Sequence, residues 1–177
     1  MNICVFCSAN NDIAPQFFTH ARQLGQWIGA HGHTLVYGGV GMGLMQCVAE
    51  ATRQAGGLVV GVVPTIVEKG GRESPCNDVR LLCDNLSDRK QLMIDRSDAI
   101  VALPGGVGTL DEIFTVLAAA SIGYHHKRVV LYNIDGFWDS LLALLSDLGG
   151  KGMIRPGFAD TLAVARSFDE LTQLLGE

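Results

Sequence analysis

Short apolar runs rich in β-branched residues alternate along the whole chain with segments of helical periodicity, and this alternation is the strongest constraint on the fold. Glycine and proline separate most of these segments. Strands that alternate with helices pair in parallel, because each helix returns the chain across the sheet. The sequence therefore predicts an α/β fold, a Rossmann-like doubly wound parallel sheet with helices on both faces.

The predicted elements follow one another without an internal repeat or a low-complexity interruption. Strands are predicted at residues 3–7, 34–37, 58–63, 80–83, 99–103, 129–132 and 162–165. Helices are predicted from Pro15 to near Gly32, over about 44–54 and 86–97, from Thr109, over 137–148, and after a capping box formed by Ser167 and Glu170. The polar segment 64–78 is predicted to be a loop with room to move.

Length and composition favour a single domain over residues 1–177. The chain has 177 residues, 48% of them hydrophobic, which is enough for one core and too little for two ordinary domains. Its net charge is −5 and its 13 Lys and Arg residues are scattered, so no basic face for nucleic acid is expected. A small anionic ligand at one site remains compatible with this charge.

Nothing in the sequence indicates a membrane or secreted protein. The longest apolar stretches, 58–64 and 99–103, fall well short of the roughly 20 residues that span a bilayer. The first seven residues lack the features of a signal peptide. Five cysteines, an odd number, argue against a disulfide framework and are expected to be reduced. The expected location is the cytoplasm.

Two glycine-rich segments each follow a predicted strand and precede a predicted helix. The first, 37–43, holds Gly38, Gly39, Gly41 and Gly43, and the second, 104–109, holds Gly105, Gly106 and Gly108. Glycines in this context let backbone N–H groups approach an anion closely. Both loops should emerge at the carboxyl edge of the sheet and line one phosphate-binding crevice. The alternative is that these glycines only form tight turns.

Neither loop matches a nucleotide-binding motif of the common kinds. No Gly-Lys-Ser/Thr triplet follows, so a magnesium-bound triphosphate is not predicted, and the spacing differs from the G-x-G-x-x-G pattern of dinucleotide sites. Glu112 lies three residues after Thr109, near whatever the second loop holds. Taken alone, Glu112 fits a carboxylate favoured by the helix dipole, and Arg89 and Lys90 fit a solvated helix face.

The segment from Pro104 to Glu112 resembles the PGGxGTxxE signature of the Lonely Guy proteins, which are cytokinin riboside 5′-monophosphate phosphoribohydrolases. The resemblance extends over nearly the whole chain, through residues 5–8, 35–45, 89–90 and 123–127. It implies cleavage of a nucleoside 5′-monophosphate to free base and ribose 5-phosphate without a metal or organic cofactor. It assigns catalysis to Arg89 and Glu112. The substrate-binding residues that it implies are Ser8, Gly38, Gly39, Gly41, Gly43, Lys90, Gly105, Gly106, Val107, Gly108, Thr109, Leu110 and Asp111.

The implied chemistry gives each residue a physical task. Positive charge builds on the sugar as the base departs, so the carboxylate of Glu112 would stabilise an oxocarbenium-like state and help to activate water. The permanently charged Arg89 would bridge phosphate and ribose or place a cation by the departing base. The N–H groups of the glycine loops and Thr109 would fix the phosphate. The substrate would be adenosine monophosphate or an N6-substituted relative.

The sequence also departs from the family pattern at informative places. Residues 7–10 replace Cys-Gly-Ser-Ser, Val40 replaces a third glycine, residues 85–88 replace Asp-Met-His-Glu, and residues 117–119 replace a Thr-Trp pair. These changes would alter phosphate contacts and the wall of the base pocket. They motivate a second hypothesis, in which the domain is a nucleotide or molybdopterin-type carrier or sensor that binds without turnover.

Other candidate groups are assigned no chemistry. Cys4 and Cys7 form a C-x-x-C without a second ligand pair, so they are expected to be buried thiols, and no histidine is assigned to a metal. The family has also carried a lysine decarboxylase label, but a chain of this length has little room for pyridoxal chemistry. A homodimer is expected, partly from the resemblance and partly from the apolar helix faces.

Overall fold

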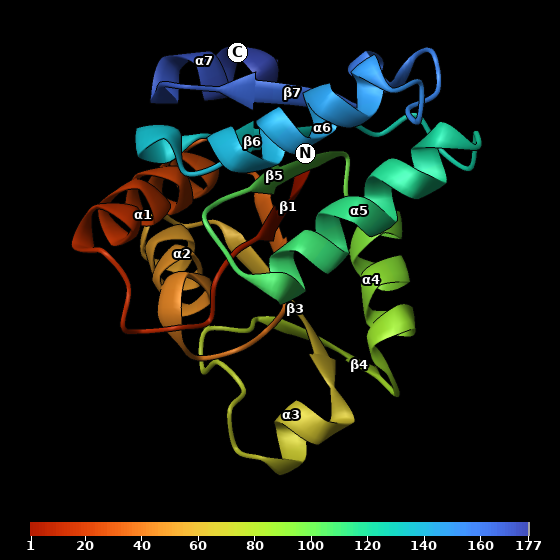
Figure 1. The fold of residues 1–177 in the computed structure, drawn as a ribbon. Coiled ribbons are helices and arrows are strands. Elements are labelled where there is room, and N and C mark those ends of the chain that lie inside the picture. Colours follow the sequence, from red (N-terminus) through yellow and green to blue (C-terminus); the bar gives the residue numbers. More distant parts are fainter. Residues whose placement is uncertain (177) are drawn as a thin grey trace.

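A computed structural model of the protein describes residues 1–176 and shows a seven-stranded parallel sheet with the strand order β4-β3-β2-β1-β5-β6-β7 (Figure 1). The strands are β1 Asn2–Phe6, β2 Thr34–Tyr37, β3 Leu58–Pro64, β4 Val79–Cys83, β5 Ala99–Ala102, β6 Val129–Tyr132 and β7 Leu162–Ala165. The helices are α1 Pro15–Ala30, α2 Gly43–Gln54, α3 Thr65–Lys69, α4 Leu86–Asp95, α5 Val107–Ser121, α6 Asp139–Gly150 and α7 Phe168–Leu174. The predicted doubly wound α/β fold is confirmed.

The core lies in two layers, one on each face of the sheet. Alternate residues of β1 belong to opposite layers: Ile3 and Val5 face one layer, whereas Cys4 and Phe6 face the other. Helices α1, α2 and α7 cover the first face, and helices α4, α5 and α6 cover the second. Because both faces are covered, the central strands are almost wholly apolar, as their sequences indicated, whereas the edge strand β4 is mostly exposed and carries Arg80.

The strand order changes direction at β1, which pairs with β2 on one side and with β5 on the other. The chain leaves β1 toward β2, β3 and β4, and returns through α4 to β5 on the opposite side. Loops that follow β1 and β5 therefore part at the carboxyl edge and leave a crevice there, which is where ligands bind in open α/β sheets. The structure places both glycine-rich loops at this edge, as predicted.

Several predicted bounds differ from the structure by one or two residues, and three differences concern the site or its surroundings. Segment 64–78, predicted as a loop, contains α3, a helix of five residues that is too short to show helical periodicity. The helix predicted from Thr109 begins at Val107, so Glu112 is the sixth residue of α5 and lies beyond its first turn. The helix predicted over 137–148 begins at Asp139, because positive φ angles at Asp135 and Gly136 interrupt the backbone just before it.

The excursion between β3 and β4 folds back onto the first glycine-rich loop. Val40 and Glu73 form an antiparallel bridge, the N–H of Gly41 donates to the carbonyl of Arg72 at 2.9 Å, and the N–H of Ser74 donates to the carbonyl of Gly39 at 2.8 Å. Asn77 accepts a 2.7 Å hydrogen bond from the Tyr37 hydroxyl. The β3–β4 excursion, at the edge of the sheet, therefore holds the first glycine-rich loop in place.

None of the helices within residues 1–176 combines the length and the apolar content that a membrane crossing requires.

Candidate functional site

A cavity of about 460 Å³ lies at the carboxyl edge, between the loops that follow β1 and β5. Its volume falls within the range of small-molecule sites. Three stretches of chain contribute most of its walls: the loop after β1, the start of α2, and the second glycine-rich loop with the first turns of α5. The lining residues are Cys7, Ser8, Ala9, Asn10, Met42, Met45, Arg89, Gly106, Gly108, Thr109 and Glu112.

The second glycine-rich loop presents an open helix end to this cavity. Gly106 precedes α5 with non-helical backbone angles, and no side chain within the described chain caps the helix. The first N–H groups of a helix have no intrahelical acceptor, and they carry the positive end of the helix dipole. Gly106 and Gly108 line the cavity, and a Cβ atom on either would meet no protein atom within 4 Å. The end of α5 is therefore suited to hold an anion.

The first glycine-rich loop is built differently, because the protein itself uses its polar groups. The N–H of Gly43 donates to Asn11 Oδ1 at 2.9 Å, and the N–H of Leu44 donates to the carbonyl of Ser8 at 2.9 Å. Gly43 has a φ of 59°, and a Cβ atom there would fall 2.5 Å from the carbonyl carbon of Ala9. This loop thus packs against the loop after β1 and contributes Met42 and Met45 to the cavity.

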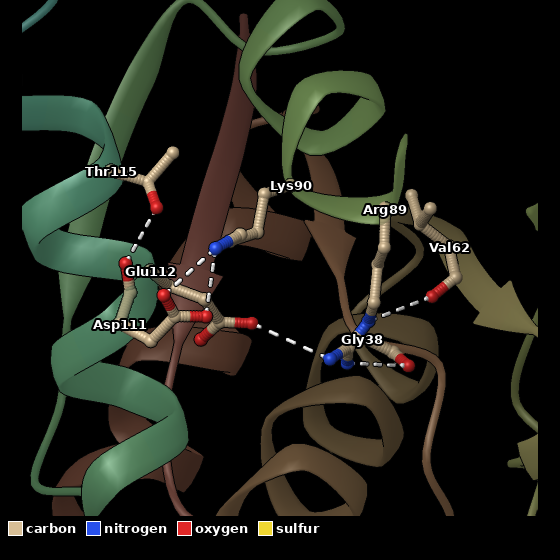
Figure 2. A network of polar contacts seen from close by, with 7 residues as sticks. All are labelled: Gly38, Val62, Arg89, Lys90, Asp111, Glu112 and Thr115. Atoms are coloured by element: carbon tan, nitrogen blue, oxygen red, sulfur yellow. Dashed lines mark hydrogen bonds and ion pairs between the residues drawn. The ribbon is translucent and has the colours of Figure 1, made fainter. Parts of the chain in front are cut away.

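Arg89 and Glu112 form a buried ion pair on the floor of the cavity. Arg89 Nη1 lies 3.6 Å from Glu112 Oε1, and the two side chains are only 12% and 5% exposed. The guanidinium also donates to the carbonyls of Gly38 at 3.0 Å and Val62 at 3.3 Å (Figure 2). A Cβ atom on Gly38 would fall 1.7 Å from Arg89 Nη2. Gly38 thus leaves the space that the guanidinium occupies.

Burial raises the pKa of Glu112 to about 7, although the nearby Arg89 cation acts in the opposite direction. The ionised form loses hydration that one ion pair at 3.6 Å does not replace. A carboxyl group that titrates near neutral pH inside a cavity is typical of a functional site. Burial also raises the pKa of the neighbouring Cys7 thiol well above its usual value, so Cys7 is neutral near pH 7 and is not an activated nucleophile.

Lys90 and Asp111 form a second ion pair beside the first. Lys90 Nζ lies 2.8 Å from each carboxylate oxygen of Asp111, and Figure 2 shows this contact joining α4 to α5. We refer to Arg89–Glu112 as the inner pair and to Lys90–Asp111 as the outer pair. The residues of the outer pair do not belong to the cavity lining within the described chain.

The structure brings some of the residues singled out in the sequence to the cavity and places others around it. Those on its walls are Ser8, Arg89, Gly106, Gly108, Thr109 and Glu112. Among the others, Gly105 lies beneath the Thr109 side chain, Val107 is 85% exposed, and Leu110 packs against the core. Gly38, Gly39, Gly41 and Gly43 shape the first loop, as described above.

Sequence reasoning missed several lining residues. Cys7, Ala9 and Asn10 follow β1, and Met42 and Met45 flank the start of α2. The sequence signals for the first three were the departure from the family pattern at residues 7–10 and the place of this loop, which borders the crevice in any sheet of this topology. The two methionines, from the start of α2, give the cavity an apolar part of its wall.

The His-Lys pair at 126–127 lies at the other edge of the sheet. These residues precede β6, so they lie at the amino end of the strands, and Lys127 Nζ donates to the carbonyl of Ile94. Cys4 is buried in the core and does not line the cavity. Within residues 1–176, no cluster of three His, Cys, Asp or Glu side chains is arranged to hold a metal ion.

Replacement of Glu112 by Gln should stabilise the fold at high pH. The folded-state pKa of about 7 lies above the ordinary value of 4.5, so the stability that protonated Glu112 contributes is fully present below pH 4.5 and is lost as the pH rises through about 7. At pH 8 the neutral Gln should raise the free energy of unfolding by up to about 3 kcal/mol. At pH 4 the difference should nearly vanish.

Urea unfolding at both pH values measures this difference. Glu50→Gln, a substitution at an exposed residue of α2, is the matched control and should change the midpoint little at either pH. A Glu112→Gln protein that is no more stable than the wild type at pH 8 would contradict a burial-raised pKa.

Solved structures with this fold include two molybdenum cofactor proteins. The chain superimposes on the molybdenum cofactor carrier protein of Chlamydomonas reinhardtii with a TM-score of 0.76 and 26% identity, over 99% of this chain and 98% of that chain. The molybdenum cofactor binding protein of Rippkaea orientalis matches with a TM-score of 0.76 and 25% identity, over 98% and 94% of the two chains.

Sequence comparison gives the family. Residues 45–175 match the family model described as possible lysine decarboxylase. A probable cytokinin riboside 5′-monophosphate phosphoribohydrolase of Oryza sativa subsp. japonica is 40% identical over 99% of this chain and 77% of its own length. A cytokinin riboside 5′-monophosphate phosphoribohydrolase of Arabidopsis thaliana is 35% identical over 99% and 81%. The chain therefore belongs to the Lonely Guy family of cytokinin riboside 5′-monophosphate phosphoribohydrolases.

Proposed function

We propose that this protein hydrolyses the N-glycosidic bond of a nucleoside 5′-monophosphate and releases the free base and ribose 5-phosphate. The observation that carries the proposal is a single cavity that holds both an uncapped helix N-terminus and a buried Arg–Glu pair. The first suits a phosphate, and the second suits a sugar that becomes cationic. Membership of the Lonely Guy family supports the same chemistry.

The phosphate is assigned to the start of α5. The N–H groups of Val107, Gly108 and Thr109 belong to the first turn of this helix, where the backbone donors have no intrahelical acceptor. Gly106 and Gly108 carry no side chain that would keep an oxyanion away from them. Arg89 adds a permanent positive charge to the same cavity.

Glu112 is assigned to the sugar. In the reaction the bond between the base nitrogen and C1′ breaks, the base leaves with the electron pair and acquires a proton, and a water oxygen bonds to C1′. The carboxylate of Glu112 stabilises the positive charge that develops at C1′ and accepts a proton from the attacking water. This role requires the ionised form, so the rate should rise as the pH increases through the pKa of Glu112, which is about 7 in the free protein.

The base is assigned to the part of the cavity wall that the methionines form. Met42 and Met45 line the cavity, and flexible thioether side chains adapt to bases of different shape. Residues 117–119, where relatives usually carry a Thr-Trp pair, do not belong to this cavity within the described chain. We propose adenosine monophosphate or an N6-substituted relative, the cytokinin riboside monophosphates, as the substrate.

A second candidate function is a carrier or sensor that binds its ligand without turnover. Similarity to the molybdenum cofactor carrier protein of Chlamydomonas reinhardtii favours it. Both functions use the N-terminus of α5 to bind an anion. They differ in the role of Glu112, which takes part in a reaction only in the hydrolase. A carrier needs no carboxylate that titrates near neutral pH, which is why we prefer the hydrolase.

Hydrolysis is tested by incubating purified protein with AMP, N6-isopentenyl AMP and the other nucleoside monophosphates, and separating products by chromatography. We expect free base from at least one substrate, with kcat/KM rising to a plateau above about pH 7. Glu112→Gln should lower kcat by at least about a hundredfold, because it removes the transition-state charge. If the wild type binds AMP but yields no base, the carrier function is correct and the hydrolase is not.

Gly108→Ala should separate stability from binding. Alanine favours a helix over glycine by about 0.5–1 kcal/mol, and its Cβ would meet no protein atom within 4 Å, so the fold should become more stable. The same Cβ lies at the proposed phosphate site. Loss of one charge-assisted hydrogen bond should weaken AMP binding about tenfold or more.

Calorimetry in the Glu112→Gln background measures AMP binding without turnover. Gly149→Ala in α6 is the matched control, because its Cβ also meets no protein atom within 4 Å and it lies outside the cavity. It should raise stability and leave binding unchanged. Equal AMP affinity in both glycine variants would contradict the placement of the phosphate.

We also propose a homodimer. An apolar groove of about 320 Å³ runs between α5 and the end of α6, lined by residues such as Phe114, Ala118, Leu148 and Met153. Phe114 and Met153 are 40% and 72% exposed in the single chain. A second copy of the chain would cover this surface. The five buried free thiols suit a reducing compartment, and we propose the cytoplasm as the location.

The dimer is tested by light scattering coupled to size-exclusion chromatography. The wild type should have the mass of two chains at micromolar concentration, and Phe114→Glu should shift it to the mass of one chain. Thr172→Glu, on the distant α7, is the control and should remain dimeric. A monomer mass for the wild type at all concentrations would contradict the proposal.

A further inference from the structure

The outer pair repeats the inner pair one residue along each helix. Arg89 and Lys90 are consecutive on α4, and Asp111 and Glu112 are consecutive on α5. The inner contact is long, at 3.6 Å, whereas Lys90 Nζ lies 2.8 Å from both oxygens of Asp111. The tighter contact thus lies outside the cavity, and the looser contact lies where the chemistry is proposed.

Two adjacent contacts constrain a pair of helices more than one contact does. A single ion pair allows one helix to rotate or slide against the other while the long side chains follow. A second contact one residue away fixes this rotation, because consecutive residues project about 100° apart on a helix. Lys90 is only 16% exposed, which shields its charge from solvent more than at an open surface.

We propose that Lys90 and Asp111 are positioning residues, whose ion pair fixes α4 against α5 so that Arg89 meets Glu112 in the geometry that the reaction requires (Figure 2). This inference rests on the proposed hydrolase function. It assigns to the pair a role other than substrate contact, in keeping with their place outside the cavity lining.

The outer pair also balances charge around Glu112. The charged groups that influence this carboxyl are Arg89 and Lys90 from α4 and Asp111 from α5. Lys90 lowers the pKa of Glu112 and Asp111 raises it, so their influences oppose each other when both are present. The neighbouring thiols of Cys4 and Cys7 on the β1 side have pKa values raised by burial and are neutral near pH 7.

Removal of one partner therefore has a signature that a merely structural role would lack. Lys90→Met leaves Asp111 unopposed and should move the acid limb of the pH–rate profile to higher pH. Asp111→Asn leaves Lys90 unopposed and should move it to lower pH. Both should lower kcat about tenfold, because a small misplacement of catalytic groups is costly.

The exchanged variant Lys90→Asp/Asp111→Lys tests the contact itself. It restores an ion pair between the helices with the charges reversed, so most of the activity and the wild-type position of the acid limb should return. Lys151→Met is the matched control, because it removes an exposed 2.7 Å ion pair to Asp147 far from the cavity. It should leave both the rate and the profile unchanged.

A ¹³C NMR titration of the Glu112 carboxyl in each variant, without substrate, provides a readout that does not depend on turnover. Opposite displacements in Lys90→Met and Asp111→Asn, with recovery in the exchanged variant, support the inference. Absence of product from the wild type would overturn the proposed hydrolase function only. The titration would still test whether Lys90 and Asp111 balance the charge around Glu112. Full activity and unmoved titrations in both single variants, in an active enzyme, overturn the positioning role.

Discussion

A carboxylate buried between two helices is the constraint on which the rest of this site depends. Glu112 is almost fully enclosed, and an ionised group there loses its hydration. The Arg89 guanidinium offsets only part of this loss, and it is itself held by two backbone carbonyls. Gly38 has to be glycine, since any side chain would displace the guanidinium. The first glycine-rich loop thus acts on the chemistry through the arginine.

The two glycine-rich loops look equivalent in sequence but perform different tasks. In the second loop, glycines keep the N-terminus of α5 open to the cavity. In the first loop, glycines permit close packing, of Gly43 against Ala9 and of Gly38 beneath Arg89. Glycine is required in both loops: in the second it gives a ligand access to backbone N–H groups, and in the first it lets neighbouring protein atoms pack closely. Which task applies depends on neighbours that are distant in the sequence.

The fold could be predicted from local pattern because both faces of the sheet are covered, which makes each strand a short apolar run. Very short elements, and element bounds that depend on tertiary contacts, could not be predicted in this way. Helix α3 has five residues, and the start of α5 depends on the backbone of Gly106. Arg89 and Glu112 could be identified through a family signature. The pairing of Lys90 with Asp111 could not, since it depends on the spacing of two helices that β5 separates in the sequence.

Segment 72–77, which precedes the edge strand β4, forms hydrogen bonds to the first glycine-rich loop. The edge of the sheet therefore helps to fix the position of a loop near its centre. Gly39 and Gly41 are tied to this segment, and Gly38, which holds the guanidinium, is their neighbour in the chain. The β3–β4 excursion therefore supports the site, although none of its residues lines the cavity within the described chain. Grafting a different excursion between relatives would reseat the arginine, even if every residue on the cavity wall stayed the same.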